Sequence, residues 1–372
     1  MSWVQAGERQ TDVVTGVDAR AQWLRVADAV PLSAGRLPVW VDLVCASGRF
    51  VDATRAYRRP DGRVLVLPLV RRRSTPGRLA LYESPPHGWE LGADSGGLVS
   101  AEPVTAQDVE AVAADLATLS AARIRIWPGT TDRRAWLEAD LPRWLRRSLT
   151  MHVVDLPAAG APPVLETLSR NTLKRVRKGE RFFDVEHDDT GRLLPVFQDL
   201  LRRSVDEWAE EHWLPTPAAR QLLIRRDPPG RRAELVRRMG GVLRVWVASE
   251  AGRPVAAIVV VSHGPTAAYW GGATDKATAG NRGAGQLLHA RALQTAVAEG
   301  RLYYDMGSSG TPDLVTFKES MGAHPVDVLS MAVEHLPVTV TEATLRGGLR
   351  SALTATAQAR RLLGRAGVSP TA

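Results

Sequence analysis

Two ionisable residues in the last third of the chain, Asp305 and Lys318, are of the types that acyl transfer to an amine requires. Such a reaction needs a deprotonated nucleophile, a stabilised tetrahedral oxyanion and a protonated leaving group. Lys318 can bring positive charge to the oxyanion or to a neighbouring phosphate, and it can equally be a surface lysine beside an aromatic core residue. Asp305 can be a general base or orient the substrate amine, and it can equally cap the turn that follows it. We predict both residues to be catalytic.

Three aromatic residues near these two are assigned to substrate binding. Phe317 directly precedes the lysine and is expected to pack and so to orient it. Tyr304 and Trp270 are interpreted as residues of the core or of a pocket wall. Metal chemistry is not expected, because the histidines are scattered without ligand spacing and the chain has one cysteine.

The elements that must position these residues are predicted from the apolar pattern. They are, in chain order, strands at Val242–Ala248, Val255–Ser262 and Thr266–Gly271, a Gly-rich turn at 280–285, a helix at Ala284–Glu299 and a strand at Leu302–Met306. The short segment 249–253, which contains a glycine, joins the first two strands as a hairpin. Asp305 therefore stands near the end of a strand, and the lysine follows in the next segment.

This order of elements resembles the GNAT acyltransferase fold. More narrowly, Leu302–Ala323 resembles the branch that contains the Fem-type peptidoglycan-bridge aminoacyltransferases and related acetyltransferase-domain proteins. There a strand ending in Asp-x-Gly precedes Phe-Lys-x-x-x-Gly, and the corresponding residues here are Asp305-Met306-Gly307 and Phe317-Lys318-Glu319-Ser320-Met321-Gly322. The resemblance implies an amide-forming acyltransferase in which the lysine supplies charge to the oxyanion or to a phosphate.

The first half of the chain predicts a similar order of elements. Strands are predicted at Trp40–Val44, Arg49–Tyr57, Arg63–Val70 and Arg123–Trp127, and a turn is predicted at 59–62. The first of these strands would bury the adjacent Cys45. A helix is predicted from the capping pair Thr105 and Asp108 to about Ala122. A length of 372 residues favours two domains. The predicted fold class is α/β (α+β), with two GNAT-like domains, each a mixed, mainly antiparallel sheet flanked by helices. Their predicted bounds are 1–155 and 156–336, followed by a basic C-terminal helix or tail at 337–372.

A stripe of cations is predicted on a helix between Pro163 and Arg181. Leu165, Leu168 and Val176 share one apolar face, and the opposite face carries Arg170, Lys174, Arg177, Lys178 and Arg181. Like charges at helical spacing repel each other, so an anionic partner would explain them, whereas a solvated face in an arginine-rich protein is the alternative. We assign Arg170, Lys174 and Arg177 to substrate binding. The resemblance implies contact with substrate phosphates or with transfer RNA.

The donor is predicted from the loop before the helix at Ala284–Glu299. Enzymes of the GNAT type that use coenzyme A resemble one another in Gln/Arg-x-x-Gly-x-Gly/Ala at a helix start, where backbone N–H groups bind pyrophosphate. Gly283 and Gly285 fit this pattern as cofactor-binding residues, but Gly280 stands where Gln or Arg belongs. This departure favours aminoacyl-tRNA as the donor substrate, with no tightly bound cofactor. The alternatives are an acyl-CoA-dependent N-acyltransferase and a non-catalytic GNAT-like RNA-binding or scaffold protein.

Composition limits the compartment and the partners. Hydrophobic residues make up 44% and charged residues 24% of the chain, as in folded soluble proteins. A formal net charge of +8 makes a polyanionic partner such as tRNA plausible, and the acceptor is expected to be an amine-bearing small molecule or peptide. The longest apolar run is far shorter than the roughly 20 residues of a membrane span, and the N-terminus lacks the order of a secretory signal. With a single cysteine, a cytoplasmic location is expected.

Overall fold

The computed structural model describes residues 4–6, 11–158, 163–211, 215–228, 230–341 and 344. Its first half contains β1 (Val4–Ala6), β2 (Thr11–Thr15), α1 (Gly16–Ala29), α2 (Pro38–Ala46), β3 (Phe50–Asp52), β4 (Arg55–Arg58), β5 (Val64–Leu67), β6 (Val70–Arg72), β7 (Leu81–Ser84), β8 (Val99–Ser100), α3 (Ala106–Leu116), β9 (Arg123–Ile126) and α4 (Arg133–Glu138). None of the helices within these ranges is long and apolar enough to cross a membrane.

The second half begins with the long strand β10 (Leu145–Asp155). It continues with α5 (Arg170–Phe182), β11 (Asp184–Asp188), α6 (Leu194–Glu211), α7 (Thr216–Arg226), α8 (Arg231–Met239), β12 (Leu243–Glu250), β13 (Arg253–His263), β14 (Thr266–Thr274), α9 (Lys276–Ala279), α10 (Ala284–Ala298), β15 (Tyr303–Ser308), α11 (Pro312–Ser320) and β16 (His324–Glu334). We propose residue 155, where β10 ends, as the domain boundary. The predicted basic helix at Leu345–Val368 lies outside the described residues.

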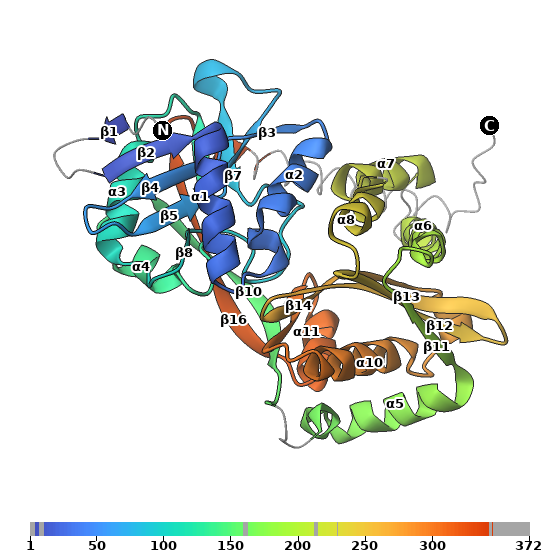
Figure 1. Cartoon of the computed structure of the whole chain (residues 1–372). Helices are drawn as coiled ribbons and strands as arrows, with labels where there is room; N and C mark the ends of the chain where they lie inside the picture. Colours follow the sequence, from blue (N-terminus) through green and yellow to red (C-terminus); the bar gives the residue numbers. More distant parts are fainter. Residues whose placement is uncertain are drawn as a thin grey trace, which may run out of the picture.

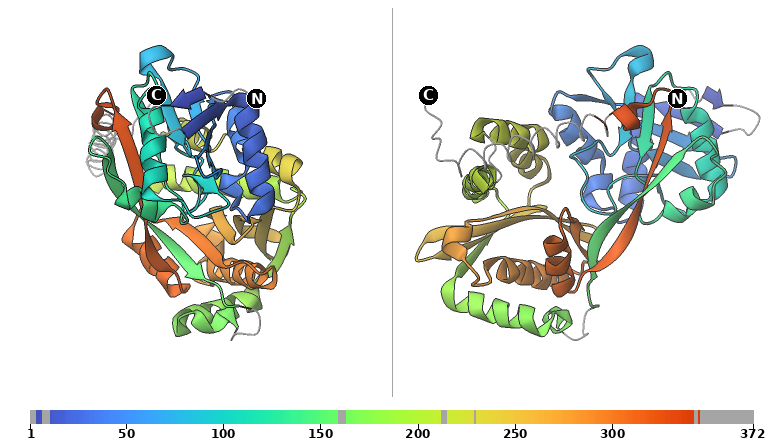
Figure 2. Two further views of the ribbon diagram at one scale, coloured as in Figure 1. Left: turned by 60° about the vertical axis from the view of Figure 1, so that its left-hand side comes forward. Right: turned by 180° about the vertical axis from the view of Figure 1, so that it is seen from behind.

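The described strands form two sheets. A five-stranded sheet in the first half has the order β1-β2-β4-β5-β8, and an eleven-stranded sheet has the order β11-β12-β13-β14-β15-β10-β16-β9-β7-β6-β3. The larger sheet runs through both halves because β10 pairs with β15 and β16, and β16 also pairs with β9. Figure 2 shows β10 and β16 as the long ribbon that joins the two halves.

A parallel strand pair connected through a helix occurs once in each half. In the first half β7 pairs in parallel with β9, with α3 between them in the chain, and in the second half β14 pairs in parallel with β15, with α10 between them. This repeated β-α-β unit is the structural basis of the similarity predicted from the sequence. The mixed, mainly antiparallel sheets flanked by helices confirm the predicted fold class.

Alternating side chains of the central strands divide the core of the second half into two layers. Val245 and Val247 of β12 pack on the face covered by α6 and α8, whereas Trp246 and Ala248 pack on the face covered by α10 and α5 (Figure 1). The first layer also contains residues of α1 and α2, so the two halves share a hydrophobic core.

Three of the strand predictions for the first half were wrong. Trp40–Val44 lies in the helix α2, which starts at Pro38; a short run that is apolar except for Asp42 fits a buried helix as well as a strand. Cys45 is therefore in a helix, and its partial burial raises the pKa of its thiol to about 12. A thiol with that pKa is not a nucleophile at neutral pH.

The other two predicted strands are each divided between the two sheets. Arg49–Tyr57 separates into β3 and β4 because the Asp52 carboxylate accepts a hydrogen bond from the Thr54 N–H and turns the chain. Arg63–Val70 separates into β5 and β6 at Pro68, which has no N–H to donate to a strand ladder. The helix α3 starts with the predicted capping box but ends at Leu116, before the predicted Ala122.

Candidate active site

The strands β14 and β15 diverge in the middle of the second half. Their parallel pairing runs from Thr266 opposite Tyr303 to Ala268 opposite Asp305 and then stops. Directly beyond it, Trp270 is the extra residue of a bulge in β14, since its two neighbours pair with consecutive residues of β13. The facing backbone edges beyond Asp305 are therefore not paired with each other. Such edges can hydrogen-bond an extended ligand segment.

Lys318 lies in the last turn of α11, and its ammonium group is fixed at the end of β15. Its side chain is 4% exposed, and Nζ donates to the backbone carbonyls of Gly307 at 2.9 Å and Ser308 at 2.6 Å. Burial lowers the pKa of Lys318 to about 8, and the nearby Asp305 opposes this shift. The group thus carries a positive charge at neutral pH close to the point where the strands diverge.

Asp305 is buried and has two backbone partners. Its Oδ1 accepts a hydrogen bond from the Gly307 N–H at 2.7 Å, and its Oδ2 accepts one from the Ala93 N–H at 2.5 Å. Burial raises the pKa of this carboxyl, while these N–H groups and Lys318 oppose the rise. The carboxylate caps the Asp-Met-Gly turn, which was one of the roles predicted from the sequence, and it also hydrogen-bonds to the loop of the first half that contains Ala93.

The loop at 91–97 occupies the position in the first half that corresponds to the diverging strands of the second. A Cβ on Gly96 would lie 2.6 Å from both the Ser84 carbonyl oxygen and Pro85 Cδ, and 2.8 Å from the Trp127 carbonyl oxygen. The glycine therefore allows the loop to pack between the ends of β7 and β9. The chain's own backbone fills this position, and only the pair β14 and β15 is left as a candidate site in the described structure.

Tyr304 and Phe317 pack around a buried histidine. The Tyr304 side chain is fully buried, and its hydroxyl hydrogen-bonds to Nδ1 of His289 at 2.8 Å; the Phe317 ring meets the same imidazole edge-on, with centroids 5.5 Å apart. Burial, together with the Lys318 charge, lowers the pKa of His289 to about 3. The neutral imidazole thus positions the strand that carries Asp305 against the helix that carries Lys318.

His289 was missing from the predicted site. Its signal in the sequence is a polar residue on an otherwise apolar face of α10, among Leu288, Ala292 and Leu293, all of which are buried. A histidine at such a position is more often a satisfied core residue than a ligand, and here it has its partner in Tyr304.

Trp270 lies between two arginines at the contact of the two halves. The guanidinium carbons of Arg231 and Arg232 are 4.4 and 5.0 Å from its ring centroid, and the Trp40 ring of α2 is 5.3 Å away. Both arginines form ion pairs with Asp227. Trp270 is half-buried in this arrangement, at the position where β14 leaves β15.

The predicted cationic stripe lies on α5, whose first turn is capped by Ser169. All five of its cations are exposed, as predicted, and their positions are Arg170, Lys174, Arg177, Lys178 and Arg181. Within the described residues none of the five has a carboxylate partner, whereas Glu180, the acid of this helix, is already paired with Arg291. The stripe therefore carries uncompensated charge, unlike the many arginines of the described residues that form ion pairs, such as Arg231, Arg232 and Arg282.

The helix α5, which carries the stripe, runs beside α10 (Figure 1). Gly283 caps this helix with φ of +86°, and a Cβ there would lie 2.2 Å from the carbonyl oxygen of Arg175 in α5. Lys178 Nζ is 3.5 Å from the carbonyl oxygen of Asn281 in the preceding loop. Gly285, in the first turn, has open space where its Cβ would be. Backbone N–H groups and one cation of the stripe, Lys178, thus lie near each other, as in an anion-binding site. Val176 and Gly179 of α5 pack against α10, so the other four cations of the stripe lie on the opposite, exposed face of α5.

The one arginine of the loop before α10 is used internally. Arg282 forms an ion pair with Glu250 and stacks on Phe182 and Phe183, with its guanidinium carbon 5.3 and 5.1 Å from the ring centroids. It is therefore not directed at a ligand. The described residues contain no group of three or more His, Cys, Asp or Glu side chains placed to hold a metal ion.

Comparisons with known proteins agree with this geometry. Residues 167–318, which include α5, α10 and Lys318, match the family model described as acetyltransferase (GNAT) domain. No sequence among curated proteins matches the chain. The crystal structure of FemX is similar over 87% of this chain and 97% of its own, with a TM-score of 0.60 and 10% identity. This likeness confirms the fold that the resemblance implied.

Two further solved structures are similar at lower scores. L-PGS from Bacillus licheniformis has a TM-score of 0.47 and 14% identity, and it covers 93% of this chain and 96% of its own. A tandem GNAT protein from the clavulanic acid biosynthesis pathway has a TM-score of 0.46 and 14% identity, with 88% and 99% covered.

Proposed function

We propose that this protein forms an amide by moving an aminoacyl group from aminoacyl-tRNA to an amine acceptor. The observation that carries the proposal is the exposed, uncompensated stripe on α5 beside the N-terminus of α10, within the segment that matches the GNAT domain. In this arrangement the phosphates of the donor lie along the stripe, and its acylated end reaches the diverging edges of β14 and β15.

The length of the stripe favours RNA over coenzyme A. From Arg170 to Arg181 the helix advances about 16 Å at roughly 1.5 Å per residue. A single pyrophosphate at a helix start needs only the donors of the first turn and an adjacent cation. Five cations over this distance match the repeated phosphates of a nucleic acid strand better. The internal use of Arg282 also removes the one arginine of the loop before α10 from contact with a pyrophosphate.

An acyl-CoA donor is the second candidate. It is supported by the GNAT match itself and by the open first turn of α10, where Gly285 leaves room for a phosphate group to approach the backbone. The two donors differ in the part of the stripe that they need, so binding experiments separate them.

The roles of the two predicted catalytic residues follow from their contacts. The neutral amine attacks the ester carbonyl, a C–N bond forms and the C–O bond to the ribose breaks. The nitrogen loses one proton, and the released ribose oxygen takes up one proton to become a hydroxyl. Lys318 contributes its positive charge to the oxyanion or to a nearby phosphate. Asp305 holds the end of β15 and the loop at Ala93, and it thereby fixes the carbonyls that orient Lys318.

The proposal is tested by native mass spectrometry of the full chain with an aminoacylated tRNA pool and, in parallel, with acetyl-CoA. Transfer is then measured with a panel of amino acids, a lysine-containing peptide and a polyamine as acceptors. We expect a complex with charged tRNA and amide product that is lost in Lys318→Met. Binding and turnover of acetyl-CoA alone would replace the preferred donor, and an absence of product with either donor would refute the acyltransferase proposal.

A further inference from the structure

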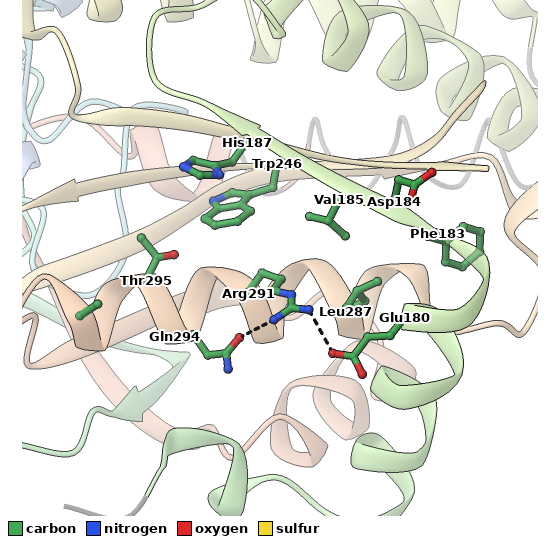
Figure 3. A pocket seen from close by; sticks show the side chains of 11 residues that line it. Glu180, Phe183, Asp184, Val185, His187, Trp246, Leu287, Arg291, Gln294 and Thr295 are labelled. Carbon is green, nitrogen blue, oxygen red and sulfur yellow. Dashed lines mark hydrogen bonds and ion pairs between the residues drawn. The ribbon is translucent and has the colours of Figure 1, made fainter. Parts of the chain in front are cut away.

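A cavity of about 550 Å³ lies outside the diverging strands, between α10 and the edge of the sheet. Figure 3 shows its two walls: β11 and β12 supply His187 and Trp246, and α10 supplies Arg291, Gln294 and Thr295. The C-terminal end of α5 closes one side with Glu180. Its volume falls within the roughly 300–1,000 Å³ of small-molecule sites.

The sheet wall of this cavity offers a stacked aromatic pair. His187 and Trp246 are directly opposite each other on β11 and β12, and their rings are 4.6 Å apart at 23°. The imidazole is exposed, while the indole is 5% exposed beneath it. A further flat ring that enters the cavity can extend this stack. Stacking on aromatic side chains is how proteins hold unpaired bases.

The charges of the cavity do not favour an anion as its occupant. Its lining arginine, Arg291, donates to the Glu180 carboxylate at 3.1 Å and to Gln294 Oε1 at 3.3 Å, so its charge is already paired. Asp184 alternates with Val185 and His187 along β11, and its carboxylate points away from α10 (Figure 3), so a phosphate would meet no unpaired cation in this lining. The amide of Gln294 and the hydroxyl of Thr295 can instead donate to and accept from a neutral polar edge.

The cationic stripe ends beside this cavity. Arg181 directly follows Glu180 in α5 and Lys178 precedes it by two residues, so phosphates bound at this end of the stripe would bring the attached nucleotide to the mouth of the cavity. We propose that the cavity binds one nucleobase of the donor, while the stripe binds its phosphates. This inference rests on the proposed function, because it takes the donor to be a phosphate-bearing nucleotide compound. Both an RNA base and the adenine of coenzyme A have the required chemistry.

The test compares ligands that differ only in their bases. One arm uses a labelled single-stranded RNA of about 12 nucleotides and its abasic twin, which has the same phosphates. The other arm uses coenzyme A and phosphopantetheine, which lacks the adenosine part. The cavity variant is His187→Ala with Gln294→Ala, both exposed and expected to fold, and the matched control is His335→Ala with Gln198→Ala, two exposed residues elsewhere.

We expect the cavity variant to bind the base-bearing ligand five- to 150-fold more weakly, roughly the effect of losing one stacked base, and to bind its twin normally. The arm in which this loss occurs identifies the source of the base. If the cavity variant keeps the full preference in both arms, the inference is overturned. The salt dependence of the abasic twin depends on the stripe alone, so it can support the proposed function even when the cavity inference fails.

Discussion

Removing three charges from the α5 stripe gives the most direct test of donor binding. The variant Arg170→Gln with Lys174→Gln and Arg177→Gln replaces side chains that are exposed and have no carboxylate partner in the described structure, so the fold loses no ion pair. If all five cations contact phosphates of a single strand, the logarithm of the binding constant falls with the logarithm of the salt concentration with a slope of about −3.5. With two cations left, the slope is about −1.4.

These slopes predict a large and measurable difference. Between about 50 and about 200 mM NaCl, binding to wild type falls about 130-fold and binding to the variant only about sevenfold. The assay is fluorescence anisotropy with labelled charged tRNA over this salt range. A control variant, Arg73→Gln with Arg78→Gln and Arg143→Gln, has the same change in net charge at exposed positions of the first half and should keep the wild-type slope. Equal slopes for all three proteins would show that the stripe is a solvated face and would refute the reasoning.

Three further predictions concern the diverging strands and their supports. Because the pKa of Lys318 is lowered to about 8 and the proposal takes its charged form as the active one, kcat/KM should fall as the pH rises through about 8. The variant Lys318→Met should lower kcat by ~10² if the lysine stabilises the oxyanion, or raise KM if the lysine binds phosphate. Values of both parameters within about twofold of wild type would remove Lys318 from the mechanism. His289→Leu leaves the buried Tyr304 hydroxyl without its partner and should lower the free energy of unfolding, measured in urea, by about 1–3 kcal/mol. Adding Tyr304→Phe should recover part of that free energy, and a double variant as unstable as His289→Leu would contradict this account. Gly92→Ala should lower the melting temperature more than Gly62→Ala. Both glycines have positive φ, but a Cβ at Gly92 would lie 2.3 Å from Asp305 Oδ2, whereas a Cβ at Gly62 would have nothing within 4 Å. Equal decreases in melting temperature would show that backbone strain alone is responsible.

The elements of the second half could be predicted because their signals are local. The strands β12, β13 and β14 are long, apolar and separated by short turns, and α10 follows a Gly-rich loop, so each boundary was found within a few residues. The run at Trp40 is too short to give a clear period, because Trp40, Val41, Leu43 and Val44 are all buried and only Asp42 is partly exposed. Only contacts with the rest of the core decide between helix and strand there.

The chemistry of the site could be predicted only in part. The types of Asp305 and Lys318 and the exposure of the α5 stripe follow from spacing and from the resemblance. Their partners do not, because the hydrogen bond from Ala93 to Asp305 joins residues 212 positions apart. The lowered pKa of Lys318 likewise comes from burial against the end of β15, which depends on how α11 packs.

The contact at Asp305 also explains why two similar halves provide one candidate site. The loop at 91–97 packs between β7 and β9 through Gly96, and through Ala93 it donates to the carboxylate at the end of β15. The segment that fills the strand pair of the first half therefore supports the strand pair of the second. Burial of Asp305 is costly unless its oxygens are hydrogen-bonded, so separating the halves would leave one oxygen without its N–H partner. The first half thus supports the candidate site rather than providing a second copy of it.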